Sequence, residues 1–127
     1  MNADLHWNTR RPPEDSTGLS EIYDLLYQLG LTAECNSFFH TAYAVYLARQ
    51  QPERLLLATR WLYPAVARHY VTTWTCVERS IRTAARATWS ANARLLERLA
   101  RRSLHQRPGA STFIAILALH SPVYPAA

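Results

Sequence analysis

One stretch, residues 65–90, limits what this chain can fold into more than any other part of the sequence. It spells AVARHYVTTWTCVERSIRTAARATWS, which predicts a short helix over 65–70, a tight turn at 71–73 and a second helix from about 74 towards 89. In the second helix, apolar groups recur every three or four residues and therefore share one face, which we expect to be buried. These positions are Val77, Ile81, Ala84, Ala85 and the methyl group of Thr88.

The other side of the second helix carries charge, because Arg79, Arg82 and Arg86 fall away from the apolar positions. A short helix, a turn and an arginine-bearing helix form the arrangement that a DNA-binding helix-turn-helix requires. Arginine pairs with guanine through O6 and N7, and a carboxylate can accept a hydrogen bond from cytosine N4. Glu78, Arg79 and Arg82 are thus suited to contact bases. The alternative is that Glu78 and Arg82, four residues apart, simply form an ion pair on the helix surface.

Threonines cluster where the second helix begins. Thr72 or Thr73 can cap this helix, and Thr75 with Glu78 has the spacing of a capping box. Threonine hydroxyls and free backbone N–H groups at a helix N-terminus bind phosphate. The sequence therefore predicts that this end of the helix lies against the DNA backbone.

Charge is distributed unevenly along the chain. All 14 basic residues are arginine, and the formal net charge is +5. Residues 1–53 carry seven acids and three arginines, whereas residues 54–127 carry eleven arginines and two acids. A basic half favours an anionic partner, most simply a nucleic acid. The alternative is a solvated surface from a genome that favours arginine over lysine, so charge alone does not decide between the two.

The rest of the sequence predicts helices and no strands, so the expected fold class is all-α, a compact bundle of about six helices. We expect the domain over 20–120, between a disordered N-terminal arm at 1–19 and a C-terminal tail at 121–127. The helix over 37–50 is apolar on most sides and should lie in the middle of the bundle. Apolar periodicity and terminal signals predict the other helices over 20–29, 53–63, 91–102 and 113–119, with Pro64 opening a helix or bending one.

Composition argues against a membrane protein, a secreted protein and an enzyme. No apolar run is long enough to span a bilayer and the N-terminus lacks a signal-peptide core, so we expect a cytoplasmic protein. No glycine-rich phosphate loop, nucleophile elbow or carboxylate cluster occurs, so we expect no catalytic residues, cofactor or small-molecule substrate. Neither His69 with Cys76 nor Cys35 with His40 has a second pair at zinc-site spacing, so we expect no metal.

The central block also resembles a known family. The segments LYPAVARHY (62–70), TTWTCVERSIR (72–82) and ATWS (87–90) are similar to the most distinctive part of the C-terminal effector domain of the stage-zero sporulation response regulator. That regulator is a transcription factor that initiates sporulation in endospore-forming bacteria. Residues 22–30 resemble the first helix of the domain and residues 108–118 its last helix, so the resemblance covers roughly residues 20–119.

This resemblance implies a six-helix domain that binds a short box of double-stranded DNA through its fourth helix, about Thr73–Ser90. Copies of the family's domain bind adjacent boxes and contact one another, which implies a homodimer or pairing with a full-length regulator. The implied base-reading residues are Glu78, Arg79 and Arg82, and the implied phosphate contacts are Thr72, Thr73 and Thr75, to which Arg86 adds charge where the family has glutamate.

Three positions near the turn depart from the family pattern. Val71 replaces a typical asparagine, and a β-branched residue is unfavourable where φ is positive, which predicts a reshaped turn. Cys76 stands where the family usually has arginine, and Trp74 is bulky near the helix start, so we expect both to make altered contacts. Cys76 lies close to arginines that can lower its pKa, although a plain thiol is the simpler expectation.

Only about nineteen residues precede the first predicted helix, so we expect no phosphorylatable receiver in this chain and control by expression or by a partner. The main hypothesis is a sequence-specific DNA-binding transcriptional regulator linked to sporulation. A second hypothesis is a protein-interaction module that antagonises a full-length regulator, which exposure of the apolar run 113–119 would favour. A third is a non-specific nucleic-acid binder, RNA included, and a fourth is a degenerate mobile-element product.

Overall fold

The computed structural model of the protein describes residues 17–120. Most of the predicted arm (1–19) and all of the predicted tail (121–127) lie outside the described residues. The exception is residues 17–19, which are helical, and Leu19 is only 1% exposed. The packed part of the chain therefore starts earlier than the sequence indicated.

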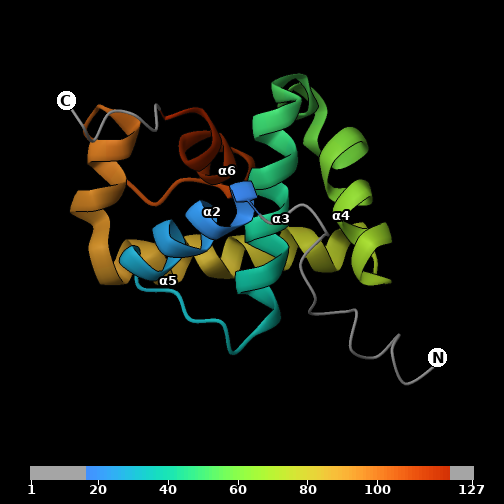
Figure 1. Cartoon of the computed structure of the whole chain (residues 1–127). Helices are drawn as coiled ribbons and strands as arrows, with labels where there is room; N and C mark the ends of the chain where they lie inside the picture. The colour runs from blue at the N-terminus through green and yellow to red at the C-terminus, as the bar shows by residue number, and fades with distance from the viewer. Residues whose placement is uncertain (1–16, 121–127) are drawn as a thin grey trace.

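The described residues form helices and contain no strand, which confirms the all-α prediction (Figure 1). There are five α-helices within residues 17–120 instead of about six, because α5 contains two of the predicted helices. In chain order the elements are α2 (Thr17–Gln28), α3 (Asn36–Gln50), the 3₁₀-helix η1 (Pro52–Leu57), the π-helix η2 (Ala58–Leu62), α4 (Tyr63–Tyr70), α5 (Trp74–Ala100) and α6 (Ala110–Leu119). No helix in this part of the chain has the length and apolar character needed to cross a membrane.

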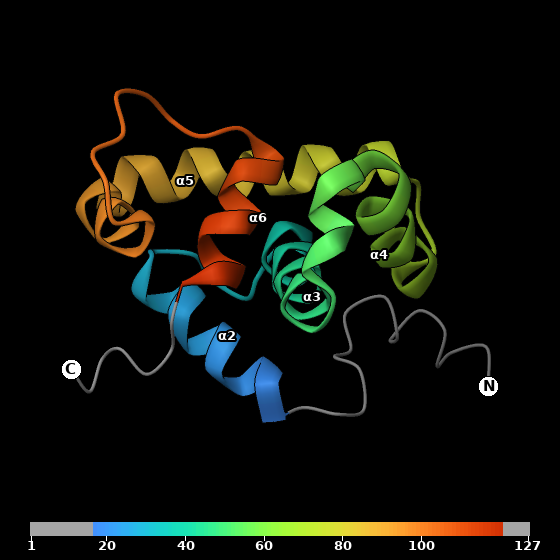
Figure 2. The same cartoon turned by 90° about the horizontal axis from the view of Figure 1, so that it is seen from above.

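Helix α3 lies in the middle of the bundle, as its apolar sequence predicted. It packs against α2, α4, α5 and α6, and Figure 2 looks along α3 with these helices arranged around it. Its buried side chains include Phe38, Ala44 and Val45. All the other α-helices are therefore positioned through their contacts with α3.

Residues 53–63 do not form the regular α-helix that was predicted. A 3₁₀-helix and a π-helix replace it, and Leu56 is 77% and Trp61 44% exposed. Three consecutive leucines point in different directions around a helix, so their periodicity did not identify a buried face. The mixed 3₁₀ and π geometry turns the chain between α3 and α4, and Arg54 links its two parts by donating from Nη1 to the Trp61 carbonyl.

Two helices begin about one turn before their predicted starts. Helix α2 begins at Thr17 instead of Ser20, which brings Leu19 into line with the buried Ile22. Helix α6 begins at Ala110 instead of Phe113, because Gly109 precedes it with extended backbone and accepts a hydrogen bond from Phe113 N at 2.9 Å. In both cases the added turn buries one more apolar side chain.

Helix α5 is broken at Asn92, where φ is −156° and ψ is 61°. We call residues 74–91 the first arm and residues 93–100 the second arm; in Figure 1 the second arm (orange) leaves the line of the first (yellow). Asn92 Oδ1 accepts a hydrogen bond from Leu95 N at 3.2 Å, which caps the second arm, and its Nδ2 donates to Gln28 O at 3.3 Å.

The end of α2 packs closely on this break. Gly30 ends α2 with a φ of 95°, and Leu31 N donates to Leu26 O at 3.0 Å, the hydrogen bond of a Schellman motif. A Cβ on Gly30 would lie 2.7 Å from Ala91 Cβ. Glycine is therefore required here both for the left-handed backbone and for the approach of α2 to α5.

Candidate nucleic-acid interface

The two helices predicted within residues 65–90 are present and are joined by a three-residue turn. Helix α4 ends at Tyr70, and Val71 follows in the left-handed conformation with φ 55° and ψ 56°. Thr72 N donates to Ala67 O at 3.0 Å and closes this end of the helix. Val71 thus adopts the positive φ that is unfavourable for a β-branched side chain, and a turn reshaped relative to the family stays a prediction. Left-handed backbone at such a residue costs about 1–2 kcal/mol.

Threonine hydroxyls surround the start of the first arm. Thr73 caps the helix, with its Oγ1 accepting from Cys76 N at 3.2 Å and lying 3.1 Å from Thr75 Oγ1. The capping box expected from Thr75 and Glu78 is wrong, because Thr75 lies inside the helix and not at its N-cap. Thr73 and Thr75 are exposed, Thr72 is half-buried, and Trp74 is 41% exposed. The hydroxyls and the indole thus lie together at one accessible helix end.

Cys76 lies one residue before the buried Val77, and its thiol is free and half-buried. Hydrogen bonds from the hydroxyls of Thr73 and Thr72 lower the pKa of Cys76, and Arg79 lowers it further. The sequence indicated arginine as the cause of such a shift, whereas the threonines contribute more. The thiolate of Cys76 therefore forms more readily than that of an ordinary cysteine, at the helix end where phosphate contacts are predicted.

The predicted base-reading residues differ in their surroundings. Arg79 is exposed and forms no ion pair within residues 17–120, and Arg86 is exposed about two turns further on. Arg82 Nη2 lies 3.3 Å from Glu78 Oε1, so these two side chains form the surface ion pair that the sequence left open. An exposed pair of this kind contributes only about 0.3–0.5 kcal/mol, so DNA can separate it at little cost.

The buried face of the first arm agrees with the predicted spacing at every position. Ala67 of α4, which faces this arm, is buried as well, and Trp89 is half-buried. Figure 2 shows the first arm along one side of the bundle, with α3 and α4 on its inner side. The side chains that are 0% exposed are Val77, Ile81, Ala84, Ala85 and Thr88.

A comparison with known families agrees with this geometry. The family model described as "Sporulation initiation factor Spo0A C terminal" matches residues 22–120, from α2 through α6. The chain belongs to this family. The Spo0A C-terminal family is a DNA-binding domain of a transcription regulator and not an enzyme family, and the match includes the turn and both arms of α5.

In this member of the Spo0A C-terminal family, a buried histidine under the first arm has a structural role that the sequence did not predict. His40 of α3 is 6% exposed, its Nδ1 lies 2.9 Å from Ser80 Oγ, and its ring lies 5.0 Å from the ring of Tyr70. Burial lowers the pKa of His40, which favours the neutral ring. His40 therefore connects α3 to both helices of the helix-turn-helix. Its signal in the sequence was a titratable residue among the apolar residues of α3, beside Phe38, Phe39 and Ala42.

The cysteine and histidine pairs considered as metal ligands make other contacts. Cys35 Sγ lies 3.0 Å from Ser37 Oγ, and the His69 ring lies 4.5 Å from the ring of Tyr43. Within residues 17–120, no group of three or more His, Cys, Asp or Glu side chains is placed to hold a metal ion.

Proposed function

We propose that this protein is a sequence-specific, double-stranded DNA-binding transcriptional regulator whose first arm of α5 enters the major groove. The support is membership of the Spo0A C-terminal family together with the two faces of this helix. One face is fully buried against α3 and α4, so the helix is held in place. The other face presents Arg79, Arg82 and Arg86 to solvent. A rigid helix with exposed arginines suits the reading of base edges.

In this proposal the exposed side chains have different roles. Arg79 contacts a guanine directly, because its guanidinium is not engaged by a carboxylate within residues 17–120. Glu78 holds the Arg82 side chain until DNA is bound and then accepts a hydrogen bond from a base, while Arg82 contacts a second base. The phosphate contacts are Thr72, Thr73, Thr75 and Arg86, and Trp74 and Cys76 alter the contacts at the helix start.

The observation that carries the proposal is the exposed Arg79, near a helix start that also carries the hydroxyls of Thr72, Thr73 and Thr75. Selection of binding sites from random duplexes at moderate salt tests it, followed by affinity measurements on the selected box and on a scrambled duplex. Arg79→Ala should weaken binding to the box by about 1–3 kcal/mol and relax the preference at one base pair. Arg60→Ala, which removes an exposed arginine from η2, is the matched control and should preserve that preference.

Two outcomes would contradict the proposal. If the unaltered protein binds scrambled duplexes as tightly as the selected box, the protein is a non-specific nucleic-acid binder. If Arg79→Ala leaves both the affinity and the preference unchanged, Arg79 does not read a base. Affinity should also fall steeply with salt, because each phosphate contact releases condensed counterions.

The hypothesis of a protein-interaction module has less support than the sequence indicated. Its expected signal was exposure of the apolar run 113–119, but Phe113, Ile114 and Leu117 are all 0% exposed. Leu119, at the end of α6, is 57% exposed. Contact between copies on adjacent boxes stays a prediction, and cooperative binding to a tandem pair of boxes relative to a single box tests it.

A further inference from the structure

The second arm of α5 and the two residues that follow it carry arginines that have no part in the proposed base-reading site. Four of them are exposed and line one hollow of about 480 Å³; we call Arg94, Arg98, Arg101 and Arg102 the arginine cluster. The carboxylate in this hollow belongs to Glu97, whose Oε2 accepts a hydrogen bond from Leu104 N at 2.9 Å. Like charges gathered in this way repel one another, and a bound anion relieves the repulsion.

Local structure holds the cluster in place. Asn92 sets the start of the second arm through its cap on Leu95 N. At the other end Arg101 has a left-handed backbone, with φ 60°, and its N–H donates to Arg98 O at 3.2 Å. Glu97 then holds the following loop through Leu104. The backbone before and after the cluster is fixed by these hydrogen bonds. The backbone therefore loses little conformational entropy when an anion binds.

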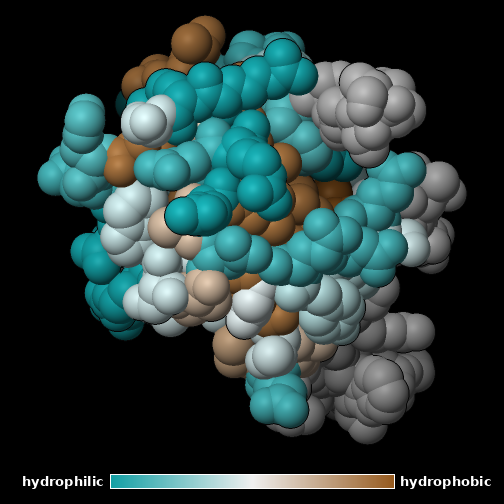
Figure 3. Space-filling model, turned by 90° about the vertical axis from the view of Figure 1, so that its left-hand side faces the viewer, coloured by the Kyte–Doolittle hydropathy of each residue, from teal (hydrophilic) through white to brown (hydrophobic). Residues whose placement is uncertain are grey.

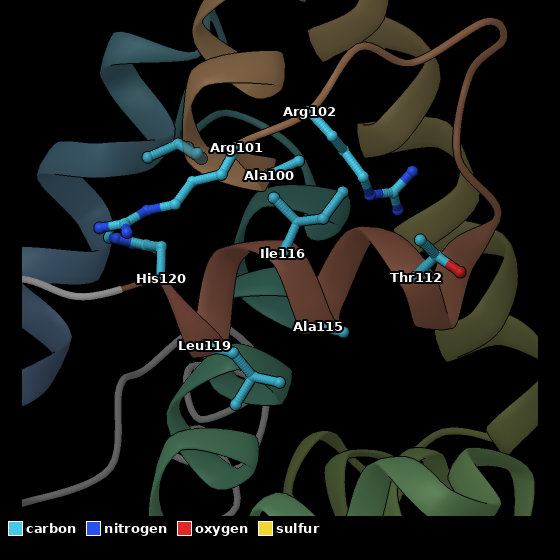
Figure 4. Close-up of a pocket in the computed structure, with 9 residues that line it drawn as sticks. Ala100, Arg101, Arg102, Thr112, Ala115, Ile116, Leu119 and His120 are labelled. Carbon is cyan, nitrogen blue, oxygen red and sulfur yellow. The ribbon is translucent and has the colours of Figure 1, made fainter.

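The four side chains do not all extend the same way. Arg101 and Arg102 also line a second hollow of about 440 Å³ between the second arm and α6. Figure 4 shows Arg101 extending towards His120 and Arg102 towards the Thr112 end of α6. Arg94 and Arg98, one helical turn apart, line the first of these two hollows only. Figure 3 views this end of the molecule, where hydrophilic residues cover most of the surface.

The position of the cluster relative to the first arm indicates what anion it meets. The first arm, with about 18 residues, is about 27 Å long at 1.5 Å per residue, whereas the major groove is about 12 Å wide. If the first arm docks through its N-terminal half and crosses the groove, its C-terminal end therefore reaches the groove edge, where phosphates lie. Figure 2 also shows the loop that follows the second arm passing α5 on the side away from α3. The exposed arginines of the first arm lie on the face opposite its buried side chains.

We infer that the arginine cluster is a second DNA-contacting surface, which binds backbone phosphates of the duplex beside the box. The inference rests on the proposed function, because it needs the first arm to be docked on DNA. Guanidinium groups donate two parallel hydrogen bonds to phosphate oxygens and keep their charge at every physiological pH. Contacts to backbone phosphates carry no sequence information, so the contribution of the cluster is independent of sequence.

Duplexes of two lengths test the inference. One ends at the selected box, and the other extends the box by about one helical turn, or about 10 base pairs, on each side. The unaltered protein should bind the longer duplex about tenfold more tightly, and Arg94→Gln/Arg98→Gln should lose most of this gain. The slope of log affinity against log salt on the longer duplex should fall by about 2, since two phosphate contacts are removed.

The controls separate this inference from the proposed function. Arg98→Gln alone is compared with Arg60→Gln, which makes the same charge change on η2 at the opposite end of the molecule (Figure 1) and should keep the length-dependent gain. Thermal unfolding checks that each variant is folded. The cluster variant should still prefer the box to a scrambled duplex, because Arg79 is intact.

Two results would overturn the inference. One is an unchanged length-dependent gain and salt slope in Arg94→Gln/Arg98→Gln while the preference for the box persists. The other is binding of inorganic pyrophosphate, measured by calorimetry and lost in that variant, without any length-dependent gain on DNA; the cluster would then take a free phosphate ligand instead of the duplex. Loss of box preference in the unaltered protein would instead contradict the proposed function.

Discussion

The two ends of the first arm of α5 are built differently. At the entry turn, residues 71–73, Val71 and Thr73 are exposed, Val71 is strained at φ 55°, and the hydroxyl of Thr73 caps the helix. At the exit kink, residues 91–93, Asn92 makes two side-chain hydrogen bonds and Gly30 of α2 packs against Ala91. The entry turn is open to a ligand, whereas the exit kink is covered by another helix.

In the proposed function the two ends of this helix therefore have different roles, DNA binding at the entry turn and stability at the exit kink. Backbone strain is tolerated where a ligand is expected, because the surrounding structure holds the strained residue in place. Close packing occurs at the other end, where the angle between the two arms is set. The stability of the domain should therefore be sensitive to the exit kink, and DNA binding should be sensitive to the entry turn.

The largest effect on stability is expected from a substitution at the exit. Gly30→Ala should lower the free energy of unfolding by about 3 kcal/mol, because alanine is strained at positive φ and its Cβ collides with Ala91. Urea unfolding measures this change. The double variant Gly30→Ala/Ala91→Gly makes space but keeps the backbone strain, so it should recover only part of the loss. An unchanged stability in Gly30→Ala would show that α2 does not pack tightly on the kink.

The next largest losses of stability are expected from removing the two helix caps. Asn92→Ala should cost about 1.5 kcal/mol, because it removes the cap on Leu95 N and the donor to Gln28 O. Thr73→Ala removes one cap at an exposed site and should cost about 1 kcal/mol. Asn92→Asp keeps the capping oxygen and should retain most of the stability. A larger loss in Thr73→Ala than in Asn92→Ala, measured by urea unfolding, would reverse the contrast between the two ends.

A substitution at the entry should stabilise the protein. Val71→Asn is expected to raise the free energy of unfolding by about 1 kcal/mol, because asparagine tolerates the left-handed backbone better than a β-branched residue. Little burial is lost, since Val71 is 74% exposed. Val71→Ile keeps the branching and serves as the control that should leave stability unchanged. Thermal unfolding of the three proteins tests this, and a destabilised Val71→Asn would show that the entry turn is not strained.

The smallest effect concerns the thiol at the entry. The pKa of Cys76 is lowered in the folded state by threonine hydroxyls, so its thiolate forms at lower pH than in the unfolded chain. In a Cys35→Ser background, the midpoint of the pH profile for alkylation by iodoacetamide should therefore be lower for native protein than for urea-unfolded protein. Thr72→Val should move the native midpoint upwards while leaving the Thr73 cap intact.

Duplex carrying the box should also slow alkylation of Cys76, because the proposed interface covers the start of the first arm. A midpoint that is the same in native and unfolded protein would contradict the hydroxyl contacts. Alkylation at equal rates with and without bound duplex would place the DNA away from the entry turn.

Much of the buried face and much of the fold could be predicted from the sequence. Positions 77, 81, 84, 85 and 88 were predicted from helical periodicity, and all are fully buried. The all-α class and the central position of α3 followed from the same kind of pattern, and the family from the residues around the turn. Periodicity succeeds at these positions because a helix with one apolar stripe has only one way to bury it.

The sequence alone therefore determined the helical class, the helix-turn-helix, the arginine-bearing face and the family to which the chain belongs. Only the tertiary structure decided that α5 breaks at Asn92, that Val71 keeps a left-handed backbone, and that residues 53–63 are irregular. The physical reason is the range of the interactions. The break depends on contacts with the end of α2, including one hydrogen bond between residues 64 apart, and no local pattern reports a contact over that distance.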